Sequence, residues 1–214
     1  MIRRHVIISG TGRAGTTFLV QLLTYLGLDT GFDSKTMEVL PTARNARLGT
    51  MDIFPIARSG LEMDILAANA PYIVKTPFLC DLIEDVLAAS VQIEHAIIPV
   101  RRFDAAAASR VHVQVQTTGS ADRTKKAPGG LWGIDKASDQ ADWLRLKFTE
   151  LIEALTQHDI PMTFLAYPRL VRDPDYLYAK LNFLLADVSS ASFRMAYDKI
   201  VRPEWVHQFT DNDR

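Results

Sequence analysis

The chain has 214 residues, of which 48% are hydrophobic, and this predicts a sizeable core and a single domain over residues 1–214. The formal net charge of -1 excludes a global positive field that would recruit nucleic acid or an anionic membrane, so an anion site would need a local cluster of cations. Cys80 is the only cysteine, which excludes an intrachain disulfide and fits a reducing compartment.

The N-terminal segment offers no targeting signal. The apolar run after residues 1–4 is broken by glycine at position 10, too early for a signal peptide or a membrane span. We therefore expect a cytoplasmic protein.

A glycine-rich loop follows the first predicted strand, at residues 5–8. The outline Gly10-x-x-x-x-Gly15-Thr16-Thr17 is that of a Walker A loop, except that Thr16 stands where a nucleotide triphosphatase has lysine. Glycines at positions 10, 12 and 15 permit positive φ, and successive N–H groups before a helix favour an anion. The loop therefore predicts a phosphate site, and a glycine-rich turn without a ligand is the alternative.

The following strands argue against nucleotide hydrolysis. That reaction would require the missing lysine and a strand-end carboxylate to hold magnesium. The strands predicted at 72–75 and 94–101 end in the cations Lys75 and Arg101. We therefore expect no metal and a transfer between anions.

Predicted strands and helices alternate along the chain. Helices are expected over residues 18–26, 56–69, 78–89, 140–158, 173–185 and 189–200, with an alanine-rich helix ending near residue 114, an irregular insertion over 30–51 and a last strand at 161–167. This order predicts an α/β fold of three layers, αβα, with a central parallel sheet and the topology of P-loop nucleotide triphosphatases. Ligands of such sheets bind outside the carboxyl ends of the strands, where Gly10, Lys75 and Arg101 lie.

The loop sequence Gly10-Thr11-Gly12-Arg13-Ala14-Gly15-Thr16-Thr17 resembles the 5′-phosphosulfate loop of the sulfotransferase family, closest to carbohydrate and bacterial members with an arginine in the loop. The resemblance implies the donor 3′-phosphoadenosine 5′-phosphosulfate (PAPS), bound by residues 12–17. Arg13 would lie near the bridging and sulfuryl oxygens. Ala14 replaces the usual serine, which removes one hydroxyl contact and leaves the backbone donors.

Three later motifs are similar to the same family. Arg101 and, eight residues later, Ser109 match the pair that grips the 3′-phosphate, and Arg102 is the alternative arginine, one residue out of register. Lys75-Thr76-Pro77 resembles the element that carries a lysine facing the sulfuryl group. The segment Phe164 to Pro174 resembles a late strand and turn, whereas nothing near the C-terminus matches the family's Arg-Lys-Gly element.

The general base is the least determined residue. The resemblance favours Glu38, in the irregular insertion, with Asp33 and then His112 as alternatives. The stretch over residues 115–138 is either a mobile lid whose Lys125 and Lys126 close over the nucleotide, or a solvated loop with Trp132 packed at its base.

The resemblance implies in-line transfer of a sulfuryl group from PAPS to a hydroxyl or amine of a carbohydrate or small-metabolite acceptor. Nucleic acid and membranes are not expected as partners. The alternatives are a P-loop nucleotide or small-molecule kinase, which would need magnesium, and a non-catalytic protein that binds phosphonucleotides.

Overall fold

The computed structural model describes residues 2–33, 61–77, 79–89, 91–203, 206 and 209. Its centre is a four-stranded parallel sheet with the order β2-β1-β3-β4. The strands are β1 Arg3–Ile8, β2 Ile73–Lys75, β3 Val91–Val100 and β4 Met162–Ala166. Because Ile8 pairs with Lys75 on one side and with Ile97 on the other, the end of β1, the end of β2 and the residues after β3 meet at one edge of the sheet.

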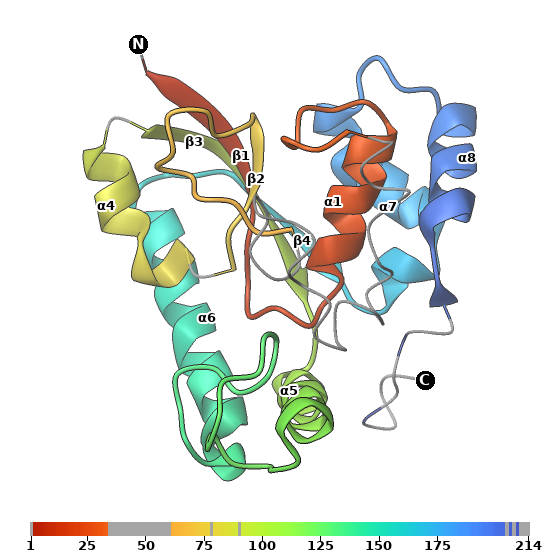
Figure 1. Ribbon diagram of the computed structural model, residues 1–214. Helices are drawn as coiled ribbons and strands as arrows, with labels where there is room; N and C mark the ends of the chain where they lie inside the picture. The colour runs from red at the N-terminus through yellow and green to blue at the C-terminus, as the bar shows by residue number, and fades with distance from the viewer. Residues whose placement is uncertain are drawn as a thin grey trace.

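Helices cover both faces of the sheet (Figure 1). Val6 and Ile8 of β1 point into one core, which also contains residues of α1 Thr16–Tyr25, α7 Pro174–Leu181 and α8 Ser190–Ile200. Ile7 points into the core on the opposite face, with residues of α4 Ile83–Ala88 and α6 Gln140–Gln157. Both faces of the strand are therefore buried, which explains its continuous apolar run. The three-layer αβα fold with a parallel sheet is confirmed.

Helix α5, Phe103–Thr118, follows β3 and lies at the carboxyl end of the sheet. Its small residues Ala106 and Ala107 pack against Leu144 of α6 in a separate buried cluster. Alanine keeps the two helices close and favours helix formation. Helix α5 begins two residues after Arg101. It places Ser109 beside the loop that follows β1, where Ser109 contacts Arg13.

Some predicted elements differ from the structure. The helix predicted over 56–69 is wrong for the described residues from 61 onward, which form turns, because this segment lies along β2 and the N–H of Met63 donates to the carbonyl of Lys75. The helix predicted over 78–89 is split into the 3-10 turn Leu79–Asp81 and α4. Helix α5 extends four residues beyond its predicted end, and α7 ends at Leu181, followed by the 3-10 turn Asn182–Leu184. None of the helices in the described part of the chain combines the length and apolar character needed to cross a membrane.

Candidate anion site at the carboxyl edge of the sheet

The glycine loop turns from β1 into α1 through left-handed backbone conformations. Gly10, Gly12 and Gly15 have φ values of 127°, 70° and 87°, and Arg13 between them has φ 58°. Gly15 is the N-cap of α1, where no side chain caps the helix, and the first turn of this fully described helix carries no acidic residue. The first N–H groups of α1 and the positive end of its dipole are therefore suited to an anion.

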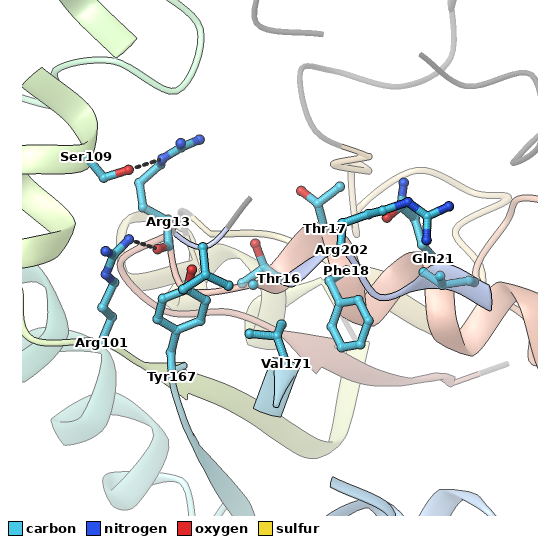
Figure 2. A pocket seen from close by; sticks show the side chains of 13 residues that line it. Arg13, Thr16, Thr17, Phe18, Gln21, Arg101, Ser109, Tyr167, Val171 and Arg202 are labelled. Atoms are coloured by element: carbon cyan, nitrogen blue, oxygen red, sulfur yellow. Dashed lines mark hydrogen bonds between the residues drawn. The ribbon is translucent and has the colours of Figure 1, made fainter. Parts of the chain in front are cut away.

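Three predicted residues from distant parts of the chain meet beside this loop (Figure 2). The Nε of Arg13 donates to the Oγ of Ser109 at 3.1 Å, and the Nη1 of Arg101 donates to the carbonyl oxygen of Arg13 at 3.2 Å. The guanidinium of Arg101 also lies over the rings of Tyr167 and Phe209, at 4.8 and 5.4 Å from their centroids. The loop, the end of β3 and α5 thus bring two guanidinium groups and a hydroxyl together.

The structure distinguishes between the two candidate arginines after β3. Arg101 is 3% exposed and lies in the site. Arg102 is the N-cap of α5, its side chain is 51% exposed, and it forms a surface ion pair of 3.8 Å with Asp104. The geometry therefore favours Arg101 with Ser109, as the eight-residue spacing predicted.

A pocket opens between these residues and the first turns of α1. Its described lining includes three arginines and no acidic residue, together with apolar and aromatic side chains; the lining is Arg13, Gly15, Thr16, Thr17, Phe18, Gln21, Arg101, Ser109, Tyr167, Val171, Ile200, Arg202 and Val206. Cationic and apolar walls in one pocket suit an organic anion. The predicted residues Gly12 and Ala14 are buried and outside this lining, and the methyl group of Ala14 is fully buried, so any contribution of Ala14 to binding comes from its backbone.

Lys75 approaches the site from β2. Its side chain is 4% exposed, and its Nζ donates to the Oγ1 of Thr17 at 3.1 Å and lies 3.8 Å from Glu62 Oε1. Burial lowers the pKa of Lys75 to about 8, Glu62 raises this pKa, and the nearby charge of Arg13 lowers it. The lysine is therefore mostly protonated at pH 7. Glu62 is a partner of Lys75 that the sequence did not reveal, because it lies in a segment predicted as helix.

Arg110 is a second residue that the sequence did not reveal. Its Nη2 donates to the carbonyl of Thr11 at 2.7 Å, and its Nη1 donates to that of Gly130 at 2.9 Å. Burial lowers the pKa of Arg110 to about 10, and Glu62 raises this pKa, so the side chain remains charged at pH 7. A Cβ on Gly12 would lie 2.8 Å from Nη2 of Arg110. Because Gly12 has no side chain, Arg110 can approach the loop and donate its hydrogen bond to the carbonyl of Thr11.

The segment over 119–136 is anchored by two fully buried glutamines. Gln114 accepts from the N–H of Leu131 and donates to the carbonyl of Lys125, at 3.3 and 2.9 Å, while Gln140 accepts from the N–H of Trp132 at 2.8 Å. Trp132 packs against the cluster between α5 and α6, as in the interpretation of a loop packed at its base. The predicted lid residues Lys125 and Lys126 are both exposed.

The base candidates are not brought together in the described part of the site. Glu38 lies outside the described residues. Asp33 and His112 are exposed, and neither belongs to the described lining of the pocket. His112 lies 5.8 Å from Phe209 between ring centroids. The assignment of the base stays a prediction.

The site thus combines a glycine-rich loop, an uncapped helix N-terminus and several cations. Such an arrangement is suited to an anion with more than one charged group. Comparisons with known proteins found no matching family model, no matching curated protein and no matching solved structure. Function therefore has to be inferred from the residues of the site.

Proposed function

We propose that this protein is a PAPS-dependent sulfotransferase acting on a hydroxyl or amine of a carbohydrate or small-metabolite acceptor. The main support is the convergence of Arg13, Arg101 and Ser109 beside the uncapped N-terminus of α1. PAPS carries two separate anionic groups, the 5′-phosphosulfate and the 3′-phosphate. The N–H groups of the loop and of α1 suit the first group, and Arg101 with Ser109 suits the second.

In the proposed reaction the acceptor atom attacks sulfur in line with the bridging oxygen. The new bond to sulfur forms as the bond between sulfur and the bridging oxygen breaks, and that electron pair leaves on adenosine 3′,5′-bisphosphate. The acceptor proton passes to a base, for which Glu38 is proposed and Asp33 and His112 are the alternatives. Arg13 and Lys75 would stabilise the charge on the sulfuryl group and the departing phosphate.

The remaining parts of the proposal concern partners and location. The near-neutral formal charge favours a small acceptor over nucleic acid or a membrane surface. The single cysteine fits a reducing compartment, and we propose a cytoplasmic location on that basis. The proposal includes a P-loop-like connection around the phosphate site, with Thr16 in the lysine position of the Walker A outline.

The test is calorimetric titration with adenosine 3′,5′-bisphosphate, compared with ATP and magnesium. The bisphosphate should bind without magnesium. Arg101→Ala should weaken binding about tenfold or more, because a charge-assisted contact to phosphate is lost. Arg102→Ala is the matched control and should change affinity less than about twofold, because an exposed arginine contributes little.

Three other results would count against the proposal. A preference for ATP with magnesium would favour the kinase alternative. Failure to bind either nucleotide would favour a non-catalytic protein. Binding of the bisphosphate that is equally sensitive to both arginine substitutions would place the 3′-phosphate elsewhere.

A further inference from the structure

The contact between Lys75 and Thr17 involves the residue that would bind a metal ion in a Walker A loop. In a Walker A loop, the hydroxyl of the serine or threonine after the lysine position binds magnesium. Thr17 holds that position in the outline Gly10-x-x-x-x-Gly15-Thr16-Thr17. Its Oγ1 accepts a hydrogen bond of 3.1 Å from the Nζ of Lys75.

A carboxylate lies on the same ammonium group. In nucleotide triphosphatases an acidic residue near the end of a neighbouring strand is the second protein partner of the magnesium ion. Here Glu62 Oε1 lies 3.8 Å from Nζ of Lys75, which ends β2 next to β1. A hydroxyl and a carboxylate therefore lie beside one cation, and that cation belongs to the protein.

The backbone fixes the position of Glu62. The N–H of Met63 donates to the carbonyl of Lys75 at 3.1 Å, which aligns the Glu62 segment with β2. Leu61, immediately before Glu62, has φ 66°, a left-handed conformation that is costly for a leucine and is retained where surrounding contacts determine it. The backbone of this segment, as well as the side-chain rotamer of Glu62, therefore holds the carboxylate beside Lys75.

The charges around this cation explain why a carboxylate is needed there. The ammonium of Lys75 is almost fully buried, and burial of a charge is costly unless an opposite charge accompanies it. Arg13 adds a second positive charge nearby, and Glu62 also acts electrostatically on Arg110. Glu62 is a negative group that acts on both Lys75 and Arg110, and its side chain is only 19% exposed.

We infer that Lys75, Glu62 and Thr17 form a cation site in which the ammonium of Lys75 takes the place of a magnesium ion, with Glu62 as the residue that positions it. The identity of the anion beside this site rests on the proposed function, whereas the cation site itself does not. Anion binding at the loop then requires no divalent ion, because a fixed positive charge already lies beside Thr17.

The first test asks whether the site accepts a metal when the ammonium is removed. Mn²⁺ alone is titrated and followed by electron paramagnetic resonance. Lys75→Ala, which removes the cation and leaves space, should bind Mn²⁺ at least about tenfold more tightly than the wild type, because the repelling charge of the ammonium is removed from beside the carboxylate of Glu62. Lys75→Met, which fills the space without a charge, and Lys75→Ala combined with Glu62→Gln should both lose this gain.

The second test follows the protonation of Lys75 by NMR with 13C-labelled lysine. Glu62→Gln should lower the pKa of Lys75 by about one unit or more, because the opposite charge is lost, and Glu62→Asp should restore part of it. A purely structural role of Glu62 would leave this pKa unchanged. Thermal unfolding of each variant shows that it is folded under the conditions used.

The outcomes separate this inference from the proposed function. Mn²⁺ binding by Lys75→Ala no tighter than by the wild type would overturn the cation site, and an unchanged pKa of Lys75 in Glu62→Gln would overturn the role of Glu62. Neither measurement contains a nucleotide. If adenosine 3′,5′-bisphosphate fails to bind while both tests succeed, the proposed function falls and the cation site stands.

Discussion

The guanidinium of Arg110 donates a 2.7 Å hydrogen bond to the carbonyl oxygen of Thr11, although the two residues lie 99 positions apart in the sequence. The same buried side chain also bonds to the carbonyl of Gly130. It therefore connects three parts of the site: the phosphate loop, helix α5 and the segment over 119–136. Because a hydrogen bond to a carbonyl restrains the orientation of its peptide group, this contact restrains the loop at Thr11.

Arg110→Ala should lower the free energy of unfolding by about 2–4 kcal/mol, because two buried carbonyls lose their charged donor and a cavity remains. Urea unfolding measures this change. Arg145→Ala is the matched control, since Arg145 is exposed and pairs with Asp104 and Asp142 on the surface; its loss should be clearly smaller, because exposed ion pairs contribute little to stability. Equal losses in the two variants would contradict a supporting role for Arg110.

Gly15→Ala should weaken binding of adenosine 3′,5′-bisphosphate as well as stability. Gly15 has φ 87°, and a Cβ there would lie 3.0 Å from Cδ1 of Leu170, so the Leu170 side chain or the loop would have to give way. Gly27 provides a control with nearly the same backbone, φ 83°, and no atom within 4 Å of its Cβ position. Gly27→Ala should cost only the left-handed conformation, about 1–2 kcal/mol.

The two glycine variants are compared by urea unfolding and by calorimetry. Both variants pay the cost of the left-handed backbone. The difference between their free energies of unfolding therefore reports the close contact with Leu170, and the difference between their nucleotide affinities reports the role of Gly15 in the anion site. Unchanged nucleotide affinity in a folded Gly15→Ala variant would show that the ligand does not use this end of α1.

Anion affinity should fall as the pH rises through about 8, the pKa to which burial lowers Lys75. Above this pH the lysine loses its proton and the loop loses a cation. Calorimetric titration with adenosine 3′,5′-bisphosphate between pH 6.5 and 9.5, roughly one and a half units on each side of this pKa, tests the prediction. In Lys75→Met the contribution of this group is absent, so the decline near pH 8 should disappear.

Unfolding does not account for that decline. The pKa of Lys75 is lower in the folded protein than its ordinary value of 10.5, so the unfolded chain binds more protons between these two pKa values. The contribution of Lys75 to stability therefore rises with pH across this interval. Affinity and the stability contribution of Lys75 should change in opposite directions, and a parallel loss of both would contradict the assignment.

Local patterns predicted the glycine-rich turn and the central strands, because glycine spacing and apolar runs act within a few residues; phosphate binding by the turn stays a prediction. The eight-residue spacing of Arg101 and Ser109 also predicted a real neighbourhood, since both reach Arg13. Glu62 was missed for a different reason. Apolar residues after it have helical spacing, but pairing of Met63 with Lys75 draws the segment along β2 instead, and a tertiary contact of this kind overrides local propensity.

Gln114 should control the mobility of the segment over 119–136. Its fully buried amide bonds to the backbone of Leu131 and Lys125, so Gln114→Ala removes both partners and leaves these buried groups to find water. Hydrogen exchange of this segment should become at least about tenfold faster, which corresponds to a loss of about 1.4 kcal/mol in local stability. Gln116→Ala, on an exposed position of the same helix, should leave exchange unchanged.

If Gln114→Ala also leaves exchange unchanged, the segment is held by Arg110 and Gln140 without Gln114. If exchange becomes faster while nucleotide affinity stays constant, the segment does not contribute to ligand binding.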